Sequence, residues 1–111
     1  MNANGMIRGF MACHMKLEPF VAHVVSCVKR QLEEFDPTSM FFMDCHTNFF
    51  LFYGQTFGKT FQLIMTFAEA EELKAKSPYA LDRYIWQEIE EKGIPIKLST
   101  HYLQTVFMGE K

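Results

Sequence analysis

Residues 39–67 of this 111-residue chain read SMFFMDCHTNFFLFYGQTFGKTFQLIMTF and contain eight of its twelve phenylalanines. Met40–His46 and Lys59–Phe67 alternate along the chain, which is typical of strands with one buried face. Phe49–Tyr53 is apolar at every position, as expected of a central strand with both faces covered. Turn-forming residues, Thr47-Asn48 and the segment GQTFG, separate these runs. The stretch therefore predicts an antiparallel meander of three strands.

The residues before the meander predict a helix that packs against it. Apolar residues, mostly valines, recur at spacings of three and four over Pro19–Phe35, with Pro19 at the first helical position. Asp36-Pro37 stops this helix. The earlier segment Met6–Met15 fits either an edge strand or a lead-in that packs on the helix.

The residues after the meander predict two helices and one more strand. Thr66 and Glu69 have the spacing of a capping box that opens the first of these helices. Ser77-Pro78 suits the start of the second, with Ser77 as N-cap, and Gly93 suits its end. We place a last strand within Ile96–Phe107.

The predicted fold is therefore an α+β domain with the order α-β-β-β-α-α-β. A three-stranded meander and a C-terminal strand form the sheet, the helices pack on one face, and Met6–Met15 would be an extra N-terminal strand in one interpretation. We treat residues 1–111 as a single domain. Residues 1–5 are mostly small and polar, and we expect them to be disordered.

Composition narrows the range of functions. The net charge of −2 argues against a nucleic-acid-binding surface, which usually needs a basic stripe. No run of 18 apolar residues exists, so we expect no membrane span. Three cysteines are an odd and sparse set, which favours free thiols and a cytoplasmic location. The aromatic content of 15% suggests that some rings lie at a self-association or partner surface.

Two Cys/His pairs are weak candidates for a zinc site. His23 and Cys27 are four residues apart on the predicted helix, and Cys45 and His46 end the first strand. Thiolate and imidazole are ligands that zinc prefers. The phases disagree, however, because neighbouring strand residues point to opposite faces. Surface histidines and inert thiols are the alternative, and we expect no metal or other cofactor.

No other motif indicates catalysis. A nucleophilic Cys13 or Cys45 would need a histidine adjacent in space, and the sequence neighbours His14 and His46 are too close along the chain. The segment GQTFGKT lacks the spacing of a phosphate-binding loop, and a strand rather than a helix follows it. We therefore expect a protein that is not an enzyme.

The favoured candidate site is an aromatic surface for a protein partner. Tyr79, Arg83 and Trp86 share one side of the helix that follows Ser77-Pro78, about a third of a turn from its apolar stripe. These residue types are enriched in binding hot spots, and Phe42 on the first strand would add to the surface. The alternative for Trp86 is a peripheral core position.

These patterns lead to two hypotheses about function. The first is a small cytoplasmic protein that binds another protein or itself, as an adaptor, inhibitor, immunity protein or chaperone-like protein. A homodimer would cover the sheet face that the helices leave open. The second is a small-ligand or zinc-binding domain that uses the Cys/His residues. Neither includes a nucleic acid or a membrane as partner.

Overall fold

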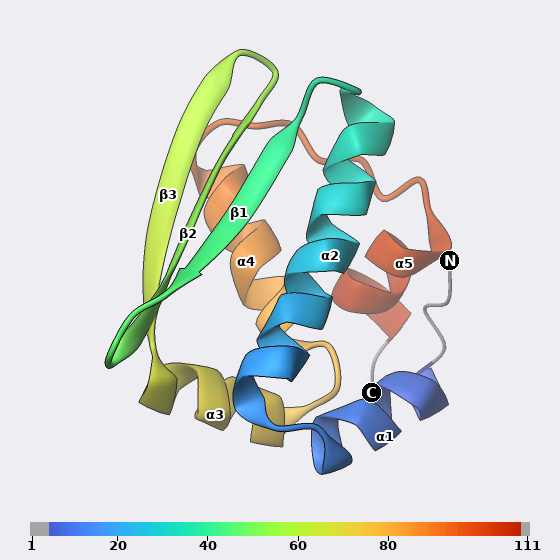
Figure 1. The fold of residues 1–111 in the computed structure, drawn as a ribbon. Helices are drawn as coiled ribbons and strands as arrows, with labels where there is room; N and C mark the ends of the chain where they lie inside the picture. The colour runs from blue at the N-terminus through green and yellow to red at the C-terminus, as the bar shows by residue number, and fades with distance from the viewer. Residues whose placement is uncertain (1–4, 110–111) are drawn as a thin grey trace.

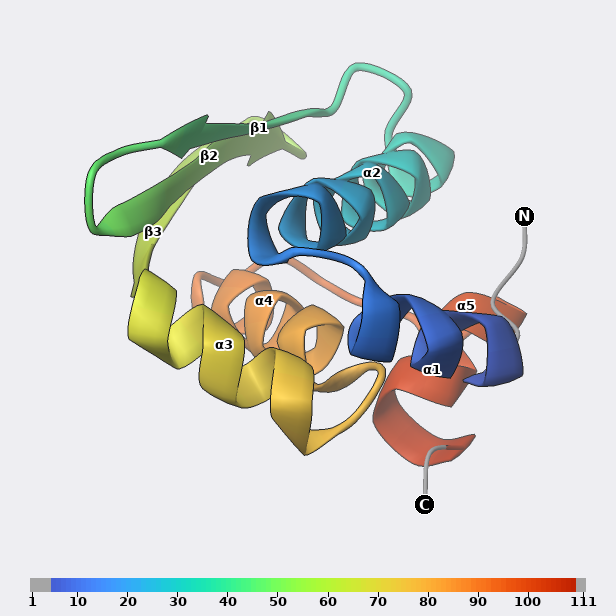
Figure 2. The same cartoon turned by 60° about the horizontal axis from the view of Figure 1, so that its bottom comes forward.

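The computed structural model describes residues 5–109, which form five α-helices, a three-stranded sheet and a π-helical turn. Figure 1 shows α2 and α4 on one side of the sheet, while α1 and α5 lie farther from it. Turning the molecule shows α3 and α1 at its lower side (Figure 2). The elements are α1 (Gly5–His14), α2 (Leu17–Phe35), β1 (Met40–Cys45), β2 (Phe49–Thr56), β3 (Lys59–Thr66), α3 (Phe67–Lys76), α4 (Ala80–Glu91), α5 (His101–Gln104) and the π-helical turn η1 (Thr105–Gly109).

The predicted meander is confirmed, with strand order β1-β2-β3 and antiparallel pairing throughout. The turn between β2 and β3 is shorter than predicted from the sequence, because β2 extends to Thr56. Phe57 and Gly58 alone make the turn, with φ of 52° and 74°. The Phe57 amide donates to Asp36 Oδ2 at 2.8 Å, which ties this turn to the end of α2.

Gly54 lies inside β2, directly between Phe41 of β1 and Phe61 of β3. The two rings approach to 5.8 Å between centroids on the buried face of the sheet. A glycine leaves room for both rings, because a Cβ at this position would lie 3.0 Å from Phe61 Cζ and 3.1 Å from Phe41 Cδ1. The close approach of the strands and rings thus requires glycine here.

α2 begins at Leu17, two residues before the predicted start, and ends at Phe35 as expected. Its valine stripe is buried against the sheet and α4, which confirms the amphipathic pattern. The α3 capping box is also confirmed: Thr66 Oγ1 accepts from the Glu69 amide at 3.1 Å, and Glu69 Oε1 accepts from the Thr66 amide at 2.8 Å.

The start of α4 differs from the prediction. Ser77 ends α3 as its C-cap, and α4 begins at Ala80 with Tyr79 as N-cap. The end of α4 is as expected. Gly93 has φ of 84°, a conformation that favours glycine, and its amide donates to the Glu90 carbonyl at 3.0 Å.

Two segments considered as strands are helical instead. Most of Met6–Met15 belongs to α1, so the edge strand does not form, and the segment is a helical lead-in whose Arg8 contacts Phe20 and Cys27 of α2. The predicted last strand in Ile96–Phe107 is replaced by α5 and η1, and the sheet described in residues 5–109 has three strands, not four. Thr100 caps α5 by accepting the Leu103 amide at 3.2 Å. Tyr102, Leu103 and Val106 are buried. Val106 lies four residues after Tyr102 and three after Leu103, which are the spacings that place side chains on one side of a helix.

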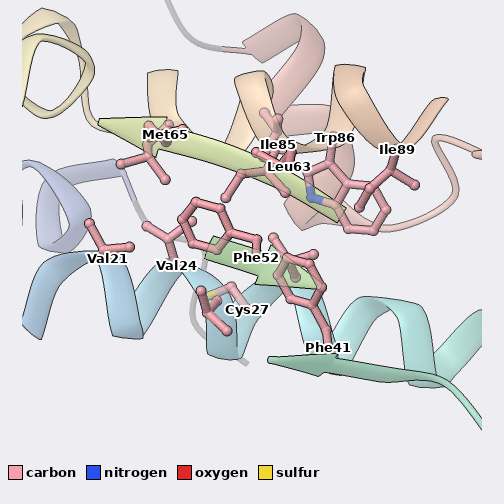
Figure 3. Packing of buried hydrophobic residues seen from close by; sticks show 14 of the residues in the cluster. Val21, Val24, Cys27, Phe41, Phe52, Leu63, Met65, Ile85, Trp86 and Ile89 are labelled. Carbon is pink, nitrogen blue, oxygen red and sulfur yellow. The ribbon is translucent and has the colours of Figure 1, made fainter. Parts of the chain in front are cut away.

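The core lies between the sheet and the helices α2 and α4. Figure 3 shows Phe41, Phe52, Leu63 and Met65 from the strands meeting side chains of these helices. The rings of Phe41 and Phe52 are stacked at 6.2 Å. Complete burial of such a side chain contributes about 1.5–3 kcal/mol each. This packing fixes which sheet face is buried and which is not.

Two further expectations concern the chain ends and the membrane. Residues 1–4 of the segment expected to be disordered lie outside the described residues, and Gly5 opens α1. Within residues 5–109, none of the helices combines the length and the apolar character that crossing a membrane demands.

Candidate functional site

The sheet face that points away from α2 and α4 is the most distinctive surface of the molecule. No helix of residues 5–109 packs on it (Figures 1 and 2). Alternation along the strands places one set of side chains on this side. We call this set the open face: Met40, Phe42, Asp44, Phe49, Leu51, Tyr53, Gln55, Thr60, Gln62, Ile64 and Thr66.

The open face is organised as cross-strand rows. Phe42 lies opposite Tyr53, and their ring centroids are 5.4 Å apart. In the next row Leu51 lies between Asp44 and Ile64. The side chains are well exposed for apolar residues, with 44% of the Phe42 surface and 57% of the Ile64 surface accessible. Pairs of this kind stabilise the sheet and also present a preformed apolar surface.

A second ring contact extends the open face beyond the strands. His46 follows β1, and its ring stacks on Phe49 at 4.6 Å between centroids. The His46 amide also donates to the Phe49 carbonyl at 2.9 Å, which closes the first turn. An imidazole held flat on a phenyl ring is positioned rather than free to rotate.

An open hollow of about 580 Å³ lies at one end of this surface. Met40, Phe42 and Tyr53 line it together with Lys92, which follows α4. Asp44 is the charged residue among the strand positions of the open face and lies toward the other end of the sheet. The face is therefore mostly neutral, with charges of opposite sign near its two ends.

The structure divides the predicted partner site. Phe42 is exposed on the open face, as predicted. Tyr79 and Trp86 are instead core residues, with 1% and 0% of their surface accessible, so the expectation of an exposed aromatic surface on α4 is wrong. Figure 3 shows Trp86 within the core. Arg83 is half-buried and its Nε donates to the Val106 carbonyl at 2.8 Å. Phe42 points away from α4, so the four residues do not form one surface.

The side of α4 that was expected to be exposed is buried because the C-terminal segment packs on it. The residues expected to form a fourth strand pack instead along the flank of α4. Trp86 Nε1 donates to Tyr102 Oη at 3.2 Å, and Val106 accepts the bond from Arg83. This segment covers the side of α4 that its sequence pattern left outside the apolar stripe. The core alternative for Trp86 is therefore the correct one.

The structure does not assemble the candidate zinc ligands. His23 Nε2 and Cys27 Sγ are 3.6 Å apart on α2. Cys45 is exposed near the first turn, and its Sγ lies 3.8 Å from the His46 carbonyl. Within residues 5–109, no three His, Cys, Asp or Glu side chains are placed to hold a metal ion.

The His23–Cys27 contact is also unsuited to nucleophilic catalysis. Burial lowers the pKa of His23, and the nearby Arg8 and Arg30 lower it further. Burial raises the pKa of Cys27, against an opposing effect of Arg8. Both shifts favour the neutral forms, whereas a nucleophilic cysteine needs its thiolate.

A buried polar network centred on Asp82 was not predicted from the sequence. Arg8 of α1 pairs with both carboxylate oxygens of Asp82, and Tyr102 Oη donates to Oδ2 at 2.7 Å. Burial raises the pKa of Asp82, but these donors oppose that shift and favour the carboxylate. Burial is the largest single effect on Arg8 and would lower its pKa, but the charge of Asp82, the hydrogen bonds to it and smaller contributions from Cys27 and Tyr102 together raise the pKa above its ordinary value, so Arg8 stays charged.

One signal for this network was present in the sequence. Asp82 lies three residues before Ile85 and four before Trp86, on the inward side of an amphipathic helix. A carboxylate at such a position needs a buried partner. Nothing in the sequence indicated that Arg8, 74 residues earlier, would be that partner.

Comparisons of the chain with protein-family models, with curated proteins and with solved structures give no significant match.

Proposed function

We propose that this protein acts by binding protein, that the open face is its binding surface, and that a second copy of the chain is the occupant. The observation that supports this most is the exposed aromatic and aliphatic surface of a sheet whose other face is fully packed. Soluble domains seldom leave such a contiguous apolar surface without a partner.

The size of the open face predicts a weak but specific pair. β2 and β3 have eight residues and are about 26 Å long, and β1 has six and is about 20 Å long. With strands about 4.8 Å apart, the open face has roughly 350 Å² of flat area per copy. Two copies would therefore bury roughly 700 Å² of flat area before the relief of the side chains is added, which places the pair with weak or transient interfaces, below about 1,200 Å². We therefore expect a dissociation constant on the order of micromolar.

The distribution of charge favours a second copy with its strands reversed. Lys92 lies near the start of β3, because Lys59 Nζ donates to the Gly93 carbonyl at 3.1 Å. Asp44 lies toward the opposite end of the sheet. A two-fold axis across the strands brings the Asp44 end of each copy over the Lys92 end of the other. Packing of this kind avoids apposing like charges and stacks two sheets about 10 Å apart.

Binding through the open face requires no catalytic residues. An adaptor, an inhibitor, an immunity protein and a chaperone-like protein all act through contact surfaces. We place the protein in this class rather than among enzymes, because the exposed surface is apolar and the buried thiol and imidazole favour their neutral forms.

Analytical ultracentrifugation over a range of micromolar concentrations tests the proposal. Phe42→Asp places a charge on the open face at an exposed position beside Tyr53, so the fold should be kept and dissociation should increase at least tenfold, about 1.4 kcal/mol. Phe10→Asp is the matched control, because Phe10 is an exposed phenylalanine on α1, away from the sheet. A wild-type chain that stays monomeric at roughly 100 µM, well above a micromolar dissociation constant, would contradict self-association, as would equal effects of the two variants.

A further inference from the structure

The Arg8 side chain occupies a site that the rest of the molecule builds around it. Its Nη1 donates to the Pro78 carbonyl at 3.2 Å and pairs with Asp82 Oδ1, while Nη2 donates to Asp82 Oδ2 at 3.1 Å. Nη2 also lies 3.4 Å from Cys27 Sγ. Two nitrogens on two carboxylate oxygens form the bidentate pair that distinguishes a guanidinium from an ammonium.

Aromatic rings complete the site. The Arg8 Cζ atom lies 4.5 Å from the centroid of the Tyr79 ring and 5.9 Å from that of Phe20. Both distances are in the range of cation–π attraction, which is strongest when the cation is removed from water. Arg8 itself is 4% exposed, so this condition holds.

The residues around Arg8 also have contacts outside α1. Asp82 is fixed by Tyr102, whose hydroxyl in turn accepts from Trp86 Nε1. Phe20 and Cys27 belong to α2, while Pro78 and Tyr79 connect α3 to α4. Arg8 of α1 is thus the bound side chain, and the residues that surround it belong to other elements. Figure 2 shows α1 in front of α2 and away from the sheet.

We propose that Phe20, Cys27, Pro78, Tyr79 and Asp82 form an alkylguanidinium-binding site, that Arg8 is its resident ligand, and that α1 is a displaceable latch. An arginine side chain from another protein has the chemistry to replace Arg8. Release of α1 is then coupled to recognition of that arginine. This site is separate from the open face, and either proposal can fail without the other.

The first experiment empties the site with Arg8→Ala and adds ethylguanidinium as the probe. Ethylammonium at the same concentration is the control, because it has the same charge but lacks the planar set of N–H donors of a guanidinium. Lys29→Ala is the matched control variant, because Lys29 forms an exposed pair with Glu33 at 3.6 Å. Thermal unfolding and the emission of Trp86, the one tryptophan of the chain, are the measurements.

We expect ethylguanidinium to stabilise Arg8→Ala saturably and ethylammonium to do so much less. At ten times its dissociation constant, the probe should raise the folded-to-unfolded ratio about elevenfold. If Arg8→Ala is unfolded, the probe should restore the native Trp86 emission. Equal effects of the two cations, equal effects on Arg8→Ala and Lys29→Ala, or no effect at all would each overturn the proposal.

A second experiment tests displacement in the wild-type chain. Hydrogen exchange is followed with and without ethylguanidinium at concentrations that saturate Arg8→Ala. We expect faster exchange of α1 amides, because the probe competes with Arg8, and unchanged exchange in the middle of α2. Unchanged exchange in α1 would overturn the latch.

Discussion

The Asp36 side chain connects the end of α2 to the turn between β2 and β3. It follows α2, and each of its carboxylate oxygens has its own donors. Oδ2 accepts the Phe57 amide at 2.8 Å, and Oδ1 accepts the amide and the hydroxyl of Thr38 at 3.1 and 2.9 Å. The Phe57 and Thr38 bonds lower the pKa of Asp36 below its ordinary value of 3.8.

Asp36→Asn should therefore remove a pH-dependent part of the stability. The pKa of Asp36 is lower in the folded chain than in the unfolded chain, so the unfolded chain binds more protons as the pH falls. The stabilising effect is complete above about pH 5 and is lost as the pH falls through the folded pKa. Urea unfolding at several pH values should show wild type and variant converging at acidic pH. Glu90→Gln, an exposed carboxyl on α4, is the control, and a constant difference for Asp36→Asn would contradict the assignment.

At the scale of elements, Gly54 limits how the three strands fit together. Phe41 and Phe61 meet across it, and the Met40 carbonyl is closer still to where a Cβ would lie. A backbone atom cannot move aside as a flexible side chain can. The sheet must therefore separate locally if any side chain is added at this position.

Gly54→Ala should lower the free energy of unfolding by about 1–3 kcal/mol, as expected for overpacking in a well-packed core. Gly9→Ala is the matched control. Gly9 lies within α1, and an added Cβ meets its nearest neighbour, Pro78 Cγ, at an ordinary 3.8 Å. This variant should be neutral or up to about 1 kcal/mol more stable, since alanine favours a helix. Urea unfolding measures both, and a neutral Gly54→Ala would show that the strands can adjust.

The elements that were predicted correctly are those with a long, unambiguous periodicity. The alternation of Lys59–Phe67 and the valine stripe of α2 each match one period over many residues. The capping box at Thr66 was found because it is a local signal. Such patterns are set within the element itself, so the sequence is sufficient to identify them.

The errors came from segments whose structure depends on distant partners. His101-Tyr102-Leu103 showed no clear alternation, and a strand was assigned where a four-residue helix packs on α4. The sequence could not decide between surface and core for Trp86 for the same reason, since the residue that covers it is the distant Tyr102. Of the expected partner surface, only Phe42 lies on the open face, where alternation alone determined its position. The association of Arg8 with Asp82 could not be predicted, because the two residues are 74 positions apart in the sequence.

At the scale of the whole molecule, folding and self-association should be linked. If two copies pair through the open face, the paired state is folded and the unfolded chain cannot pair. The thermal midpoint should then rise with protein concentration across the micromolar range.

Ile64→Lys tests this linkage. Ile64 is 57% exposed, so a lysine there should leave the monomer fold intact while placing a cation within an apolar contact. We expect the wild-type midpoint to increase with concentration and the variant midpoint to stay constant, with the two converging at nanomolar concentration. Scanning calorimetry measures the midpoint at micromolar concentrations, and the intrinsic fluorescence of Trp86 measures it at lower ones. A concentration-independent wild-type midpoint would contradict the link.

The alternation of the strands has a consequence for how this protein can evolve. Along β1, β2 and β3, every second residue builds the core and the residues between them build the open face. If the open face is a binding surface, mutations at the outward positions would change what it recognises while the inward positions keep the core. Specificity could then drift through neutral intermediates, and a duplicated copy of the gene could acquire a new partner while keeping the same scaffold.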